Sequence, residues 1–239
     1  MPRVRFERVA DEQRPPSARV PLGGAARRSA APLPDDVVAE IIGATSRNVG
    51  ARMTTRLADA TAAYERARYG DAKRMAKSVL RAAPESRAAA ELHALCQYRL
   101  GYYRAAAKEL EVLLEADHTY SHHPVLADCY RAMGRYARAR TVWNELKDAS
   151  PSPELMAEGR IVMAGVLADQ DRVGEAIDLL EKAVRPLRKP REHHIRTWFA
   201  LGALYERAGD TARAKVLFSQ VYAADPQMAD VVARLEDLS

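Results

Sequence analysis

The chain of 239 residues has little of what several common classes of protein require. Glycine, at 12 residues, and aromatic residues, at 6%, are scarce, while Ala, Leu, Arg and Glu are abundant, and this balance favours helices. Two cysteines cannot build a disulfide framework. No apolar run approaches the roughly 18 residues of a membrane span, and the N-terminus has no apolar signal-peptide core. We therefore expect a cytoplasmic, all-α protein.

The net charge of +5 is unevenly distributed along the sequence. Residues 1–33 contain seven Arg and three acidic residues, a net charge of +4, which leaves +1 for residues 34–239. The same segment contains five Pro and too few apolar side chains to offset the entropy of ordering it. The sequence predicts a disordered Arg/Pro-rich tail over residues 1–33 and a folded domain over 34–239.

One stretch near the C-terminus, residues 198–226, has a distinctive spacing of large and small side chains. If Trp198 is numbered position 4, large residues fall at 4, 7, 11 and 24, and small residues at 8 and 20. Small side chains at 8 and 20 allow two antiparallel helices to approach closely, and the large ones fill the space around them. Gly at position 15 serves the turn, and Pro at 32 ends the second helix.

The same frame recurs upstream, which indicates five copies of a helix pair. Position 8 is occupied, in order, by Ala60, Ala94, Ala127, Ala164 and Gly202. The copies at 122–151 and 195–226 fit best, whereas the first has Arg56 and Asp59 where apolar residues belong. A last segment, "MADVVARLEDL", has apolar residues along one face and predicts a capping helix.

From about Thr54 to its end the chain resembles the tetratricopeptide repeat family. The resemblance implies a right-handed α-solenoid of helix-turn-helix repeats with a C-terminal capping helix. It also implies a non-catalytic scaffold that holds a partner peptide or helix in a groove lined by the first helices. The Ala/Arg-rich composition is reminiscent of stand-alone repeat proteins of bacteria with GC-rich genomes.

Family geometry aims positions 2, 5, 9, 12 and 13 of each copy at the groove. Tyrosine, phenylalanine and arginine are prominent there, so we expect a partner that is acidic and has an apolar anchor. The carboxylate clamp of the chaperone-binding subclass needs Lys at position 5, which is absent. The candidate partner-binding residues are Tyr64, Glu91, Leu95, Tyr98, Arg99, Asp128, Arg131, Arg196, Phe199, Glu206 and Arg207.

Other chemistries have weaker support in the sequence. The motifs of nucleotide-binding, metalloprotease and serine hydrolase enzymes are missing, so we expect no enzyme activity and no cofactor. His118 and His122 are spaced i,i+4, and His193 and His194 are adjacent, but a structural or surface role is favoured over a metal site.

Two further interpretations concern basic segments and thiols. The tail and the basic segment 185–194, interpreted as a protruding loop, leave open an alternative function in weak, non-specific nucleic-acid binding. Cys96 and Cys129 both occupy position 10 of their copies. Because adjacent copies are about 10 Å apart, too far for a disulfide, we expect two buried, reduced thiols. The sequence makes no prediction of oligomeric state.

Overall fold

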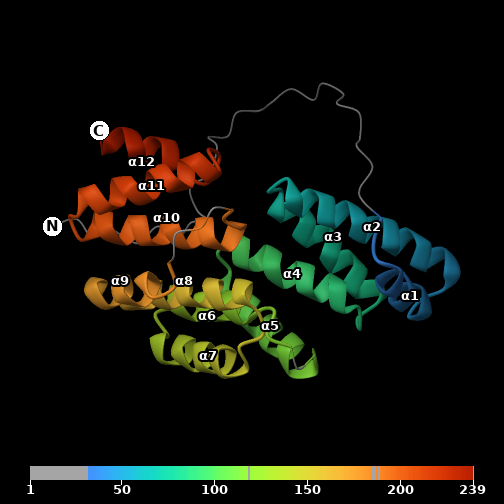
Figure 1. The fold of residues 1–239 in the computed structure, drawn as a ribbon. Helices are drawn as coiled ribbons and strands as arrows, with labels where there is room; N and C mark the ends of the chain where they lie inside the picture. Colours follow the sequence, from blue (N-terminus) through green and yellow to red (C-terminus); the bar gives the residue numbers. More distant parts are fainter. Residues whose placement is uncertain (1–31, 118, 185–186, 188, 239) are drawn as a thin grey trace. The chain divides into compact units, whose positions relative to one another are not determined.

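A computed structural model describes residues 32–117, 119–184, 187 and 189–238, and these residues form twelve helices and no strand (Figure 1). They fall into two compact units, residues 32–119 and 120–238. The predicted disordered tail lies outside the described residues, except for Pro32 and Leu33. No helix in the described part of the chain is both long and apolar enough to cross a membrane.

The unit of residues 32–119 contains two antiparallel helix pairs preceded by one short helix. The short helix, α1, packs on α2 and buries Ile41 completely in a core that also contains Leu57 and Leu92. The pairs α2–α3 and α4–α5 correspond to the first two predicted copies, and α3 packs against α4. The helices of this unit are α1 (Asp35–Gly43), α2 (Arg47–Glu65), α3 (Tyr69–Ala82), α4 (Arg87–Arg99) and α5 (Tyr103–Asp117).

The unit of residues 120–238 contains three helix pairs and a final helix. The first helices of its pairs lie side by side, because α8 packs against both α6 and α10. The last helix, α12, packs on α11 with Val231 fully buried and Leu235 and Leu238 against the core, which confirms the predicted cap. The helices are α6 (His123–Ala132), α7 (Tyr136–Ala149), α8 (Pro153–Asp169), α9 (Val173–Glu181), α10 (Glu192–Arg207), α11 (Thr211–Ala224) and α12 (Val231–Asp237).

The turn inside every pair has the same backbone conformation at position 15. Three copies have glycine there, and glycine adopts a positive φ at little cost. The first and fourth copies have Ala67 and Asp171 instead, with φ of 56° and 60°. An L-residue adopts this left-handed conformation only at a cost, so the packing of these two pairs must impose it. The three glycines are Gly101, Gly134 and Gly209, with φ of 80°, 71° and 81°.

The small residue at position 8 is buried in all five copies, as the spacing predicted. In the fifth copy Ala214, at position 20, is also fully buried. The atoms nearest to Gly202, however, belong to position 24. A Cβ added to Gly202 would lie 2.8 Å from Cε1 of Phe218. At this point of contact between α10 and α11 a glycine therefore faces an aromatic ring, and no larger residue fits.

The second pair, α4–α5, is joined in part by a polar network in place of apolar contacts. His93 and Gln97, at positions 7 and 11, both contact Glu109 of α5. His93 Nδ1 lies 2.8 Å from Glu109 Oε2, and Gln97 Nε2 donates to Oε1 at 2.7 Å. Burial acts to raise the pKa of Glu109, but the bonds from His93 and Gln97 outweigh it and hold the pKa below its ordinary value.

Replacing Gly202 with Ala tests this packing. A glycine-to-alanine change inside a helix ordinarily stabilises it, because alanine has the higher helix propensity. At Gly202 the new methyl group would overlap the Phe218 ring, so we expect a loss of about 1–3 kcal/mol in the free energy of unfolding.

Gly174→Ala is the matched control for this change. Gly174 lies in α9 with no atom within 4 Å of an added Cβ. Urea denaturation should therefore show this variant to be no less stable than the wild type. Equal behaviour of the two variants would mean that the repeat frame is shifted.

Candidate functional site

The predicted groove residues are divided between the two units. Those of residues 32–119 lie on α2 and α4, and those of residues 120–238 lie on α6 and α10. In the first unit Leu95 is half-buried and Glu91 is exposed on α4. The chemical surroundings of the two sets differ.

In the unit of residues 32–119, aromatic side chains gather where the paired helices turn. Tyr64 and Tyr69 meet edge to face with ring centroids 5.2 Å apart, and Tyr98 and Tyr103 repeat the pairing one copy later at 6.1 Å. Arg99 joins the two copies: its Nη2 donates to Tyr69 Oη at 2.6 Å, and its guanidinium lies 5.0 Å from the Tyr69 ring centroid. We call Tyr64, Tyr69, Tyr98, Arg99 and Tyr103 the tyrosine–arginine cluster.

The cluster presents both apolar area and positive charge to solvent. Its four tyrosines are half-buried, Arg99 is exposed, and no carboxylate among the described residues pairs with that guanidinium. Burial raises the pKa of Tyr64, so its hydroxyl stays protonated and able to donate a hydrogen bond. Beside the cluster, the Lys73 ammonium lies 4.2 Å from the centroid of the Tyr102 ring.

Sequence reasoning missed Tyr69 and Tyr103 as members of a site. Both occupy position 17, which the frame treats as part of the turn, outside the groove positions. A signal was present, because the pairs Tyr64–Tyr69 and Tyr98–Tyr103 have the same internal spacing of five residues and recur 34 residues apart. This surface is identified by a pair of aromatic residues that recurs from one copy to the next, and not by a single position of the frame.

In the unit of residues 120–238 each predicted charged residue forms an ion pair within the unit. Arg131 Nε donates to Asp128 Oδ1 at 2.7 Å, and its Nη1 donates to Asp169 Oδ2 of α8 at 2.9 Å. Its aliphatic part packs on α8 so closely that a Cβ at Gly165 would lie 3.2 Å from Arg131 Cδ. Arg131 therefore ties α6 to α8, and its side chain is only 11% exposed.

Three more cross-links continue this arrangement, which we call the ion-pair ladder. Arg196 of α10 donates to Glu158 of α8 at 2.8 Å. Arg207 donates to Asp171, in the turn after α8, at 3.0 Å, while Glu206 accepts from Arg234 of α12. The ladder consists of Asp128–Arg131–Asp169, Glu158–Arg196, Asp171–Arg207 and Glu206–Arg234.

Phe199, predicted to be an apolar anchor for a partner, lies in the core. Its side chain is 3% exposed and packs against Phe218 with ring centroids 5.5 Å apart. The guanidinium of Arg234 lies 5.5 Å from the Phe199 ring centroid. Because α12 carries Arg234, the capping helix covers the ring that the repeat frame assigns to the groove.

The surroundings of the histidines and cysteines are those of side chains with a structural role. No group of three or more His, Cys, Asp or Glu side chains in the described part of the chain has the geometry of a metal site. His118 lies outside the described residues, and His123 is buried at the start of α6 with Nε2 3.4 Å from Glu145 Oε2. Cys96 and Cys129 are free and buried, and burial raises the pKa of both thiols, that of Cys96 to about 11.

The basic segment 185–194 differs from the predicted loop at its C-terminal end. Helix α10 begins at Glu192, so Glu192, His193 and His194 are helical. Arg191 donates to Glu154 of α8 at 3.2 Å, which partly neutralises it. Residues 185, 186 and 188 lie outside the described residues.

The stack of helix pairs is that of a helical-repeat protein, a class that holds other molecules on extended helix surfaces. Two family models described as "Tetratricopeptide repeat" match residues 125–189 and 195–228. These matches identify tetratricopeptide repeats in the two segments, and the structural neighbours below share the fold. No curated protein sequence matches the chain.

Solved structures of repeat proteins share the fold at low sequence identity. A thermophilic TPR protein of Thermus thermophilus superposes with a TM-score of 0.62 at 20% identity, over 78% of this chain and 98% of that one. A tetratricopeptide repeat protein of Parabacteroides merdae gives 0.64 at 18%, over 85% and 78%. The apo quorum sensor NprR of B. thuringiensis gives 0.64 at 14%, over 78% of this chain but only 57% of its own.

Removal of Arg131 tests the structural role of the ladder. Arg131→Ala leaves two largely buried carboxylates without their cation, so we expect a loss of about 3 kcal/mol or more in unfolding free energy. Arg172→Ala removes an arginine whose ion pair with Glu175 is exposed on both sides, and it should change stability far less. The free energies of unfolding of both variants are measured by chemical denaturation. If they are equally stable, the buried pairs do not hold α6 on α8.

Stability of the 120–238 unit should also depend on His123. Burial is the main influence on this imidazole, and it lowers the pKa in the folded state. The unfolded chain therefore binds the proton more tightly, and stability decreases as the pH falls below the unfolded value of about 6.5. We expect the melting temperature to drop between pH 7.5 and 5.5, and to drop less in His123→Phe. The same drop in both proteins would contradict this assignment.

Proposed function

We propose that the protein is a non-catalytic scaffold that holds a segment of a protein partner on the tyrosine–arginine cluster. Support comes from one observation above all: Arg99 stands among tyrosines as a guanidinium without a carboxylate partner in the described residues. Tyr and Arg dominate binding hot spots because they bury large areas and donate directed hydrogen bonds at modest entropic cost. In keeping with this role, the expected location is the cytoplasm.

The contrast with the ion-pair ladder supports this choice of surface. A partner carboxylate that approached Arg131 would have to displace Asp128 and Asp169, which already hold that guanidinium. A carboxylate that approached Arg99 would displace only the hydroxyl of Tyr69. The proposed partner is therefore a peptide or helix with an acidic residue for Arg99 and an apolar residue for the neighbouring tyrosine rings.

The alternative of nucleic-acid binding gains no support from the segments on which it was based. The tail is outside the described residues, and in the basic segment 185–194 Arg191 is paired with Glu154. We therefore propose a protein as the partner.

The test is capture of partners with the tagged protein and with a double variant, Tyr98→Ala with Arg99→Ala. Both changes remove contact area and charge from the cluster without touching the apolar core, so the melting temperature should stay within a few degrees of the wild type. Affinity for the captured partner should fall about tenfold or more, equivalent to about 1.4 kcal/mol.

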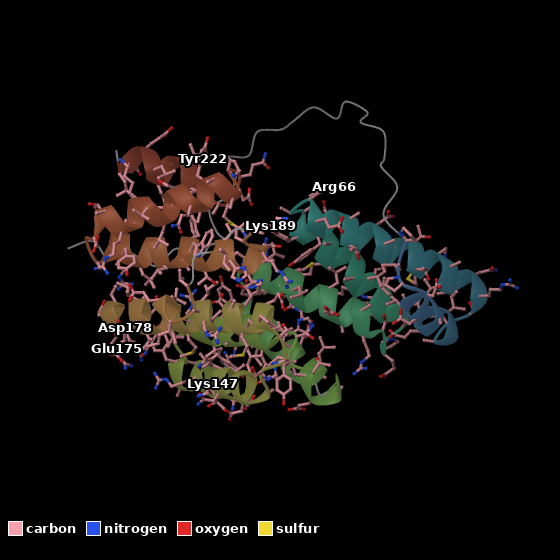
Figure 2. All side chains as sticks on the ribbon, in the orientation of Figure 1. Arg66, Lys147, Glu175, Asp178, Lys189 and Tyr222 are labelled. Carbon is pink, nitrogen blue, oxygen red and sulfur yellow. The ribbon has the colours of Figure 1, made fainter. Side chains whose placement is uncertain are left out.

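The matched control is Tyr222→Ala with Arg81→Ala, which removes the same side-chain types elsewhere. Tyr222 is 47% exposed on α11 (Figure 2), and Arg81 is exposed on α3. The control pair should bind the partner like the wild type. Unchanged binding by the Tyr98/Arg99 variant would mean that the partner binds another surface.

A further inference from the structure

The first helix pair, α2–α3, is much more basic than the rest of the described chain. Residues 47–82 contain nine Arg or Lys and three Asp or Glu, so nine minus three gives +6, more than the +5 of the entire protein. Eight of the nine basic side chains are exposed, including Arg66 at the C-terminal end of α2 (Figure 2). Positive charge in the folded part is thus concentrated on one hairpin.

An open hollow of about 250 Å³, which we call the cavity, lies on the surface of this hairpin. The first copy has Arg56 at position 4, where the fifth copy buries Trp198. Arg56 is exposed and lines the cavity in this pair. The lining residues of the cavity are Arg56, Arg68, Asp71, Arg74 and Met75.

The charges in the cavity do not balance. Asp71 accepts from Arg68 Nε at 2.9 Å and also from Arg74, and these bonds, that from Arg74 first, lower the pKa of the carboxyl group. Arg56 has no partner among the described residues. Three guanidinium groups and one carboxylate give the lining a net charge of +2. Asp71 also orients Arg68 and Arg74, because each donates to it from one side.

We propose that this cavity binds the phosphate group of a phosphorylated side chain carried by a protein partner. A phosphate monoester has a charge of about −1.5 to −2 at neutral pH, which matches the lining, whereas a carboxylate would neutralise only half of it. Its three oxygens suit several guanidinium groups at once. Met75 offers an apolar surface for the methylene group that carries the phosphate.

A single cavity favours a protein partner over a nucleic acid. Arginine clusters that surround one point recognise single phosphoryl groups, whereas a nucleic-acid strand is held by charges that follow successive phosphates along a track. The inference does not depend on the tyrosine–arginine cluster, because the cavity residues and the cluster residues are different side chains.

The experiment is calorimetric titration of the full-length protein with O-phospho-L-serine at pH 7.5 and low salt. We expect saturable binding at one site per chain, no binding of L-serine, and weaker binding of inorganic phosphate, which lacks the methylene group. Arg56→Gln should weaken O-phosphoserine binding about tenfold, as expected for loss of a charged hydrogen bond. Arg47→Gln, an exposed arginine of α2 outside the cavity, should bind like the wild type.

A change of pH gives a second readout. The phosphate monoester loses its second charge near pH 6, so affinity for O-phosphoserine should fall several-fold between pH 7.5 and 5.5. Absence of saturable binding, or equal weakening in Arg47→Gln and Arg56→Gln, would overturn the proposal.

Two further outcomes would also overturn it. One is tighter binding of inorganic phosphate than of O-phosphoserine. The other is binding of a single-stranded oligonucleotide that weakens in Arg56→Gln while O-phosphoserine does not bind. Because no partner protein is used, none of these results bears on capture through Tyr98 and Arg99.

Discussion

Close contact between the two helices of each pair is the constraint on which the rest of the structure depends. It requires a side chain no larger than alanine at position 8, and all five copies supply one. In the fifth copy a Cβ at position 8 would overlap the ring of Phe218, and glycine stands there. This contact sets the distance between paired helices. It therefore also sets which residues reach the next pair.

The sequence predicted the parts of the fold that repeat, and failed where a neighbouring element alters a repeat. Helix pairs, turns and the cap follow from spacing, because each depends on contacts inside one copy. The burial of Phe199 does not, because its ring contacts both Phe218 of its own pair and Arg234 of α12. Likewise Arg131 and the two carboxylates around it all occupy groove positions, Asp128 at position 9 and Asp169 at position 13, but the spacing alone does not show that they pair with one another.

The arginines of the ion-pair ladder differ from Arg99 and Arg56 in whether a carboxylate neutralises them. In residues 120–238 each arginine of the ion-pair ladder faces a carboxylate of another element, so charge is used for cohesion between helices. In residues 32–119 Arg99 and Arg56 have no carboxylate partner in the described residues. Paired charges add to specificity of packing, whereas unpaired ones remain available to ligands. Under the proposed function, binding and cohesion are thereby assigned to different arginines of one chain.

The left-handed turn residue also has a consequence for the order of folding. Repeat stacks fold by nucleation in one pair and growth into its neighbours. Pairs with glycine at the turn reach this conformation at little cost, but in the first and fourth pairs the helix packing must offset the cost at Ala67 and Asp171. The pairs α2–α3 and α8–α9 should thus be less favourable starting points for folding than the three pairs with glycine. The basic hairpin with its cavity is one of these two.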